Sequence, residues 1–319
     1  EVLATTLKVQ ALAVRPHRVI GDKEQLVRRI IEVLPHLEAD FVRRQLNSPS
    51  RFRYISRRLT PEQVNRINAI GEPGLEFHDE AERVYPNGSL AAHVLGYTNI
   101  DGRGMAGIER SFDERLSTEE QLNKPLQLSI DVRVQHALEY ELNAAMEKFS
   151  AIGAAGIILD VETGELLAMA SLPAFDPNAV SRSPSETWFN RATQGVYEQG
   201  STFKIFSTAM ALEEGTVTLG TTYDISEPLA VGRFRIRDYR LNFKELTLAG
   251  IFMHSSNIGT ALMALDMGTE TQQAYMRKLG LLEPAQIELK ESGAPLLPNP
   301  WSKASTMTIS YGHGIAVTS

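Results

Sequence analysis

One serine and one lysine near the middle of the chain have the types and the spacing of a nucleophile and its base. Ser201 and Lys204 stand three residues apart in the stretch YEQGSTFKIF. On an α-helix this spacing places both side chains on one face, one turn apart. A serine at a helix N-terminus lies beside free N–H groups, which favour a developing oxyanion. An amine held among apolar residues is disfavoured in its charged form, so Lys204 can accept the proton of the serine hydroxyl.

The same two residues also have an ordinary structural explanation. Ser201 can cap a helix, and Lys204 can lay its stem on the surface with its amine in water. A Ser-x-x-Lys pattern arises by chance about once in a chain of this size. Two observations favour chemistry: the pattern occurs once in 319 residues, and its helix has no polar face for a lysine. The apolar residues that predict a helix buried in the centre of its domain are Ile205, Phe206, Ala209, Met210 and Leu212.

A second polar motif, Ser255-x-Asn257, lies about fifty residues further on in the stretch MHSSNIG. It precedes an apolar helix, so we expect it on a tight loop or at the helix entry. Serine and asparagine are favoured N-caps, and capping is therefore the competing explanation. As part of an active site, Ser255 would relay a proton to a leaving amine, and Asn257 would bind both Lys204 and a substrate amide.

Several elements must position these motifs. Asp131 is expected to cap a helix that runs through Phe149, and two apolar strands should follow it at 154–159 and 166–172, joined by a hairpin. We expect the buried side of that helix to hold Val134, Leu138, Leu142, Ala145 and Phe149. Nearer the N-terminus, Asp22 with Gln25 and Thr60 with Gln63 have the spacing of capping boxes for two further helices. A polar stretch near residues 116–125 predicts a boundary between domains 1–122 and 123–319.

The composition excludes several classes of protein. The net charge of −7 and the pI near 5.6 argue against nucleic-acid binding, and the basic run Arg51, Arg53, Arg57 and Arg58 is interpreted as a solvated face. The chain has no cysteine, which removes disulfides, thiolate metal sites and a cysteine nucleophile. The sequence contains no run of about 18 apolar residues, which is the length that would predict a membrane span.

The order of these motifs and the residues around them resemble those of the penicillin-binding proteins and serine β-lactamases. The stretches YEQGSTFK, AAGIILDVETGELLAMASLPAFDPN, SSNIGTALMAL and MTISYGHGIAVT look like a class B penicillin-binding protein of the septal, division type. HVLGYTNIDGRGMAGIERSFDERL is similar to the end of the pedestal domain of that class. The resemblance implies an α/β (α+β) two-domain fold. An elongated, dimerisation-like pedestal would precede an incomplete penicillin-binding/β-lactamase-like transpeptidase domain, whose antiparallel sheet is flanked by helices.

The resemblance also implies a function. Ser201 would attack the D-alanyl-D-alanine end of a peptidoglycan stem peptide, and an amine of a second stem peptide would then take the acyl group. Lys204 would be the base, and Ser255 and Asn257 would complete the catalytic set. β-Lactams would acylate the same serine, and no metal or organic cofactor is implied. The partners would be a membrane-embedded glycan polymerase and other division proteins. The protein would sit in the cytoplasmic (inner) membrane through a single-pass anchor upstream, with its domains facing the periplasm.

One motif of the family is missing from these residues. The third motif, Lys-Thr/Ser-Gly, occurs nowhere in the 319 residues. In the family its strand binds the substrate carboxylate and supplies the second oxyanion N–H, whose loss typically costs about 3 kcal/mol of transition-state stabilisation. We therefore expect a chain truncated at both ends that is inactive or nearly so, within a natural protein that is a transpeptidase.

Two other functions remain open at this stage. One is a β-lactamase or D,D-carboxypeptidase, although no motif identifies the glutamate that deacylation by water requires. The other is a non-catalytic scaffold or docking protein of the cell-wall synthesis machinery. His313, between Gly312 and Gly314, is interpreted as a turn or packing residue, and a catalytic pair of His254 with Ser255 is disfavoured because no acid partner is placed for His254. Trp188 and Trp301 are assigned to the core or a cleft rim, and Tyr311 to the neighbourhood of the cleft.

Overall fold

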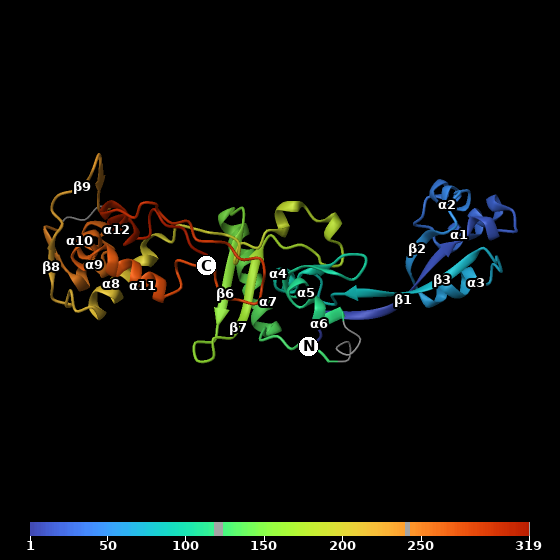
Figure 1. Ribbon diagram of the computed structural model, residues 1–319, viewed down its shortest axis with the longest axis horizontal. Coiled ribbons are helices and arrows are strands. Elements are labelled where there is room, and N and C mark those ends of the chain that lie inside the picture. The colour runs from blue at the N-terminus through green and yellow to red at the C-terminus, as the bar shows by residue number, and fades with distance from the viewer. Residues whose placement is uncertain (118–123, 240–242, 319) are drawn as a thin grey trace. The chain divides into compact units, whose positions relative to one another are not determined.

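A computed structural model describes residues 1–117, 124–239 and 243–318 (Figure 1). It forms two compact units. The first unit comprises residues 1–88 and 98–103, and the second comprises residues 89–97 and the chain from residue 104 onward. The boundary predicted at 122/123 lies outside the described residues and stays a prediction. None of the helices within the described ranges is long and apolar enough to cross a membrane.

The first unit is built on a three-stranded antiparallel sheet. Its order is β2-β1-β3, with β1 (Thr5–Val14) between β2 (Arg53–Leu59) and β3 (Leu75–Val84). β1 pairs with β3 along its whole length, from Thr5 opposite Val84 to Val14 opposite Leu75. Only the second half of β1, Ala11–Val14, is fully buried. The core of the unit therefore lies at that end of the sheet.

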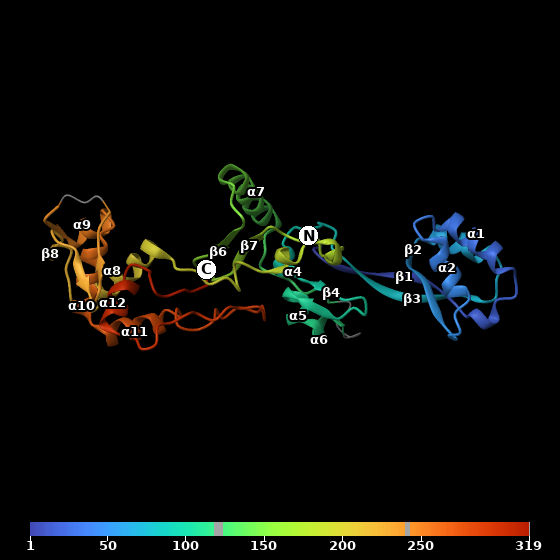
Figure 2. The same cartoon turned by 90° about the horizontal axis from the view of Figure 1, so that it is seen from above.

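Three helices cover this end of the sheet: α1 (Lys23–Val33), α2 (Ala39–Leu46) and α3 (Pro61–Asn68) (Figures 1 and 2). The short 3-10 helix η1 (Pro16–Arg18) follows β1. The buried core residues are Leu12, Val14, Leu26, Val27, Ile30, Leu34, Val42, Leu46, Ile55, Leu59 and Ile67. The apolar spacing in α1 and α3 follows from this packing, since it presents one side of each helix to the core.

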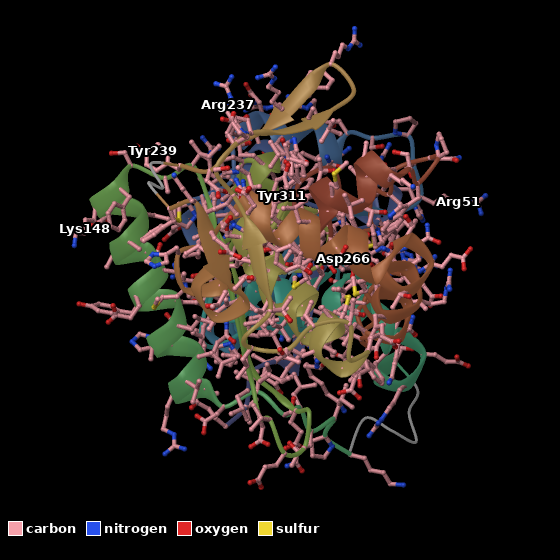
Figure 3. All side chains as sticks on the ribbon, turned by 90° about the vertical axis from the view of Figure 1, so that its left-hand side faces the viewer. Arg51, Lys148, Arg237, Tyr239, Asp266 and Tyr311 are labelled. Atoms are coloured by element: carbon pink, nitrogen blue, oxygen red, sulfur yellow. The ribbon has the colours of Figure 1, made fainter. Side chains whose placement is uncertain are left out.

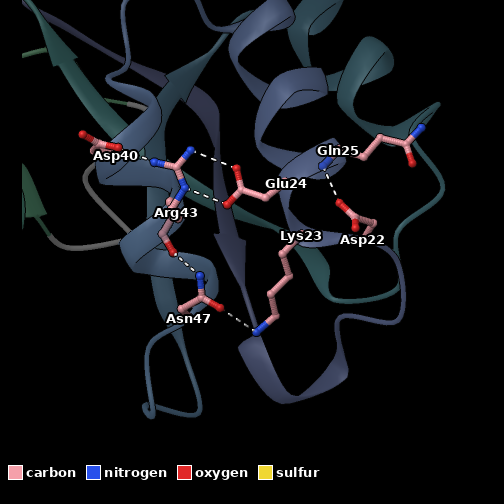
Figure 4. Close-up of polar contacts among 7 residues, drawn as sticks. All are labelled: Asp22, Lys23, Glu24, Gln25, Asp40, Arg43 and Asn47. Carbon is pink, nitrogen blue, oxygen red and sulfur yellow. Dashed lines mark hydrogen bonds and ion pairs between the residues drawn. The ribbon is translucent and has the colours of Figure 1, made fainter.

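The two predicted capping boxes differ in the structure. The box at α3 is confirmed, because Thr60 accepts from the Gln63 N–H while the Gln63 side chain accepts from the Thr60 N–H. At α1 only half of the box forms. Asp22 accepts from the Gln25 N–H at 2.8 Å, but the Gln25 side chain points away from it (Figure 4). The short aspartate satisfies the N-terminal N–H alone, and the exposed Gln25 amide is left to solvent.

In the second unit, a helix packs against a hairpin as predicted. α7 (Val132–Phe149) is capped by Asp131 and packs on β6 (Ala154–Leu159) and β7 (Leu166–Leu172), which pair antiparallel. Gly156 allows close approach, because a Cβ there would lie 2.9 Å from Leu138. The predicted buried side is only half-buried at Val134, Leu138, Leu142 and Ala145, and the prediction is wrong at Phe149, which is 71% exposed. Phe149 is the last residue of the helix, and its neighbour Lys148 points outward (Figure 3).

Short elements precede α7 and follow the hairpin. Before α7 lie α4 (Ala92–Leu95), β4 (Tyr97–Thr98), β5 (Gly104–Ala106), α5 (Gly107–Ser111) and α6 (Asp113–Ser117). After β7 come the 3-10 helices η2 (Val180–Arg182), η3 (Ser185–Trp188) and η4 (Gly200–Thr202). The pairs β8 (Thr222–Asp224) with β11 (Glu245–Thr247) and β9 (Leu229–Val231) with β10 (Phe234–Ile236) are antiparallel. The mixed α+β prediction is thereby confirmed.

A cluster of five helices holds the residues around Ser201. α10 (Asn257–Met267) contacts α8 (Phe203–Glu213), α9 (Leu248–Met253), α11 (Thr269–Lys278) and α12 (Lys303–Ile309). Their shared core consists mainly of Phe203, Met210, Leu248, Met263, Met276, Ile309 and Ile315. The expectation that α8 is buried all round is wrong, because Ile205 is 53% exposed. Within the described residues, neighbouring helices cover one side of α8 and leave the side of Ile205 open.

Candidate active site

Ser201 lies in the turn that leads into α8. It is the middle residue of η4, and α8 follows directly at Phe203. Gly200 begins the turn with a φ of +58°, a left-handed conformation that glycine adopts without steric cost. Ser201 is exposed. The structure thus places its hydroxyl at the accessible N-terminal end of a helix, as the sequence predicts.

Lys204 lies one turn further along and is only 2% exposed. Its amine donates three hydrogen bonds, to the Ser255 carbonyl oxygen at 2.6 Å, the Asn257 Oδ1 at 2.7 Å and the Ser255 Oγ at 2.9 Å. An ammonium has three N–H donors, so all of them are used. Burial lowers the pKa of Lys204 to about 8, against the field of Asp238, which raises it. The lysine therefore changes charge near neutral pH, in the range useful for a catalytic base.

The Ser-x-Asn motif forms the turn between α9 and α10. Ser256, the middle residue, performs the capping, since its side chain accepts from the Gly259 N–H at the start of α10. Ser255 and Asn257 are thus free to face Lys204. Ser255 has a φ of +55°, an uncommon conformation for a residue with a Cβ. Its hydroxyl donates to the Ser201 Oγ at 3.1 Å, which joins the two motifs.

The site therefore forms a row of three groups: Ser201, Ser255 and Lys204. Within the described ranges, no direct hydrogen bond links Lys204 to Ser201, and the Ser255 hydroxyl stands between them. Asn257 lies beside this row and accepts from Lys204. The structure therefore brings together all four residues selected from the sequence. The arrangement can move a proton from the Ser201 hydroxyl to an amine and leave an oxygen nucleophile at the surface.

Sequence reasoning missed Asp238, which holds the Ser-x-Asn turn. Its carboxylate accepts from the Ser256 hydroxyl at 2.6 Å and from the N–H groups of Asn257 at 2.5 Å and Ile258 at 3.0 Å. A carboxylate at a helix N-terminus is stabilised by the free N–H groups and the helix dipole. In addition, the Arg237 carbonyl oxygen accepts from the Asn257 side chain at 3.2 Å. No spacing rule links an acid after β10 to a helix almost twenty residues later, so only the fold could reveal it.

Sequence reasoning also missed the partner of His313. Its Nδ1 lies 2.9 Å from the Glu198 Oε2, while the Gly314 N–H donates to the other oxygen of that carboxylate at 2.7 Å. His313 is a turn residue, as interpreted, yet it has an acid partner. His254, by contrast, stacks on Phe243 with 4.9 Å between ring centroids.

The remaining residues singled out from the sequence lie around the site or away from it. Trp188 is 43% exposed, whereas Trp301 is half-buried and donates to the Gln272 side chain. Tyr311 packs against a buried cluster that includes Ile236, Leu246 and Ile258.

Comparisons with known proteins identify the family. Residues 154–319 match the family model of the penicillin-binding protein transpeptidase domain, and residues 1–126 match that of the penicillin-binding protein dimerisation domain. The chain is 39% identical to the probable peptidoglycan D,D-transpeptidase FtsI of Caulobacter vibrioides over all of its own length and 54% of that protein. It is 31% identical to the peptidoglycan D,D-transpeptidase FtsI of Escherichia coli, over 99% of the chain and 58% of that protein.

A solved structure shows the same fold. The crystal structure of penicillin-binding protein 2X from Streptococcus thermophilus matches with a TM-score of 0.75 at 21% identity, and the match covers all of this chain and 55% of that one. At this identity the match concerns the fold alone. The chain spans about half the length of the curated relatives it matches. With both family models matched in order, the chain belongs to the penicillin-binding protein family, as a class B member that is similar to FtsI.

Proposed function

We propose that the chain is part of a peptidoglycan D,D-transpeptidase that works through an acyl-enzyme on Ser201. The observation that carries the proposal is the hydrogen-bonded row in which the Ser255 hydroxyl links the Lys204 amine, at 2.9 Å, to the Ser201 hydroxyl, at 3.1 Å. The names of the FtsI relatives and the matched transpeptidase family model support the same reaction.

The proton moves along this row. Of the three acceptors around the Lys204 amine, two are carbonyl oxygens, which only accept hydrogen bonds. The third is the Ser255 hydroxyl, which can also donate. When Lys204 is neutral, its lone pair turns to the Ser255 hydroxyl, and Ser255 in turn accepts the hydrogen bond of Ser201. Ser201 then loses its proton to Ser255 as it attacks, while Ser255 passes its own proton to Lys204.

The chemistry proceeds in two acyl transfers. The Ser201 oxygen forms a bond to the carbonyl carbon of the penultimate D-alanine, and the bond from that carbon to the terminal D-alanine nitrogen breaks. The proton held at Lys204 returns through Ser255 to the leaving nitrogen. An amine of a second stem peptide then attacks the ester, losing a proton along the same row, and Ser201 recovers its hydroxyl. Splitting one exchange into two transfers is nucleophilic catalysis.

A strained β-lactam amide fits the same sequence of steps, because ring opening replaces departure of the leaving amine. The acyl group then stays on Ser201. We therefore propose that β-lactams inhibit the protein covalently. The Asn257 side chain accepts from Lys204 and donates one N–H to the Arg237 carbonyl oxygen, so its second N–H would bind the amide of the stem peptide or the antibiotic.

We propose that the 319 residues alone have little activity. They contain no Lys-Thr-Gly or Lys-Ser-Gly. The family resemblance assigns to that motif the second oxyanion N–H, and the loss of one such donor typically slows catalysis by about 10²–10³-fold. The active form would be a longer protein, of the length of the FtsI relatives, which this chain covers by 54–58%.

The proposed setting is cell division. By similarity to FtsI, the protein would be held at the cytoplasmic membrane with the site facing the periplasm, where the stem peptides are. Its pedestal, which we assign to residues 1–122, would contact a membrane-embedded glycan polymerase and other division proteins. The transpeptidase domain would begin at residue 123.

Labelling with a fluorescent penicillin tests the proposal. The full-length protein should become labelled, the Ser201→Ala variant should not, and the 319-residue chain should be labelled at least 10²-fold more slowly. The acyl group should stay on Ser201 long after labelling, because no motif in the sequence identifies the glutamate that deacylation by water requires. Rapid deacylation would favour a β-lactamase, and normal septation by cells that carry only Ser201→Ala would favour the scaffold function.

A further inference from the structure

A carboxylate three residues before Ser201 joins the nucleophile's turn to the segment after α12. The Glu198 carboxylate accepts from the Gly314 N–H at 2.7 Å and pairs with the His313 Nδ1 at 2.9 Å. The hydrogen-bonded row of Ser201, Ser255 and Lys204 uses none of these groups. They therefore need an explanation of their own.

The backbone strengthens this connection. The Gly200 N–H donates to the Gly312 carbonyl oxygen at 3.1 Å, and Tyr197 and Val317 exchange two backbone hydrogen bonds of 2.9 and 3.0 Å. Gly312 has a φ of +75°, and a Cβ there would lie 2.1 Å from the Gly200 carbonyl oxygen. Only a glycine at position 312 lets the two turns come so close.

This contact fixes the orientation of one particular peptide group. The Gly200 carbonyl oxygen and the Ser201 N–H belong to the same peptide, and a trans peptide directs its C=O and N–H to opposite sides. Because Gly312 packs against the oxygen, the N–H of Ser201 is directed away from Gly312. As one of the first N–H groups of η4, it has no partner within the helix.

We propose that Glu198 and the turn Gly312–Gly314 form a clasp that aims the Ser201 N–H at the oxyanion of the acylation transition state. The inference rests on the proposed function, in which that N–H is the nucleophile's own oxyanion donor. Glu198 is a positioning residue here, because it acts through the backbone of residues 200 and 201 and touches no reacting atom.

An ordinary surface ion pair is the competing explanation. The side chains of His313 and Glu198 are 64% and 46% exposed, and isolated pairs of this kind contribute little to stability. The clasp differs because the same carboxylate also accepts a backbone N–H of the turn that packs on Gly200. The Gly314 N–H, together with His313, keeps the pKa of Glu198 below its usual value, so the carboxylate stays charged at neutral pH.

The experiment compares an ester substrate with its thiono analogue, in which the reacting C=O is replaced by C=S. Sulfur is a poor hydrogen-bond acceptor, so a misdirected N–H slows acylation by the oxygen ester more than by the thiono ester. The full-length protein is prepared as wild type and as Glu198→Ala, Glu198→Gln and His313→Ala. Glu186→Gln, an exposed glutamate in η3, is the matched control.

The clasp predicts that Glu198→Ala slows acylation by the oxygen ester about 10–100-fold and lowers the oxygen-to-sulfur rate ratio. Glu198→Gln keeps an acceptor for the Gly314 N–H and should lie between Glu198→Ala and wild type, as should His313→Ala. The control should match wild type. The clasp is overturned if any one of the three variants acylates at the wild-type rate. It is also overturned if any of them slows acylation by the oxygen ester and by the thiono ester equally. A wild-type protein that neither ester acylates overturns the proposed function as well.

Discussion

The Ser255 hydroxyl accepts a hydrogen bond from the buried amine of Lys204 at 2.9 Å and donates one to Ser201 at 3.1 Å. The lysine therefore reaches the nucleophile through a second serine. Among the described residues that bind the Lys204 amine, Ser255 is the one whose side chain can both give and take a proton, so it is central to the proposed chemistry.

Removing the Ser255 hydroxyl should stop the relay without harming the fold. Ser255 has a φ of +55°, where glycine is relaxed and alanine is strained, so Ser255→Gly is the cleaner variant. We expect it to remain folded, because relief of backbone strain opposes the loss of one hydrogen bond to the Lys204 amine, and to be acylated about 10²–10⁴-fold more slowly by a penicillin in the full-length protein. Stopped-flow acylation and thermal unfolding measure the two effects. A Ser255→Gly variant that is acylated at the wild-type rate would remove Ser255 from the mechanism.

The rate of acylation should depend on the charge of Lys204. Burial lowers the pKa of this amine to about 8, so below pH 8 it is charged and cannot accept a proton. As the pH rises through about 8, the neutral amine forms and acylation should speed up, then level off. Measurement of acylation from pH 6 to 10 checks this. A flat profile over the range would show that the amine is not the base.

Asp238→Asn should alter this profile in two opposite ways. The aspartate raises the pKa of Lys204, so removing its charge should move the rising limb to lower pH. It also holds the Ser-x-Asn turn through three hydrogen bonds, so the plateau rate should fall. Among the described residues, Asp238 is the charged group that acts on Lys204. A variant with a lower plateau and an unmoved limb would show that Asp238 acts through structure alone.

His93 should make the second unit sensitive to acid. It is buried on α4, its Nε2 lies 2.8 Å from the Thr187 carbonyl oxygen, and desolvation lowers its pKa to about 4. The folded state keeps His93 neutral while the unfolded state protonates it near pH 6.5. Stability is therefore complete above pH 6.5 and lost as the pH falls from 6.5 toward 4, by up to about 3 kcal/mol.

Urea unfolding of the 319-residue chain at pH 7 and pH 5 measures this loss through tryptophan fluorescence. Both tryptophans, Trp188 and Trp301, belong to the second unit. His93→Gln keeps an N–H donor but does not titrate, so its stability should change less between the two pH values. Equal changes in the two proteins would contradict the assignment.

The α3 cap predicts a local effect in the first unit. Thr60→Ala removes the side chain that accepts from the Gln63 N–H, and this should lower the free energy of unfolding of that unit by about 1 kcal/mol. Glu24→Gln is a suitable comparison, since Glu24 pairs with Arg43 at the surface (Figure 4) and such pairs contribute less. A hydrogen-exchange measurement on residues 61–68 would show the change. Equal exchange in Thr60→Ala and wild type would mean that the cap adds nothing.

The predictions from sequence were good where the signal is local. The helix 132–149, its Asp131 cap and the hairpin strands follow from periodicity and turn residues, and the structure confirms their limits. The four motif residues were selected by type, spacing and order along the chain, and the structure brings them together, while their roles stay predictions. The exposure of Ile205 and Phe149 was missed because apolar periodicity does not say which neighbours cover a helix. Asp238 and Glu198 were missed because their partners lie 18 and more residues away, across turns whose approach depends on the fold.

Intact-protein and peptide mass spectrometry after exposure to benzylpenicillin tests the central claim most directly. If Ser201 is the nucleophile and Lys204 activates it through Ser255, the full-length protein gains one penicilloyl group. That group maps to the peptide with Ser201 and is absent from Ser201→Ala. An adduct on another residue, or no adduct in a folded full-length protein, would contradict the account.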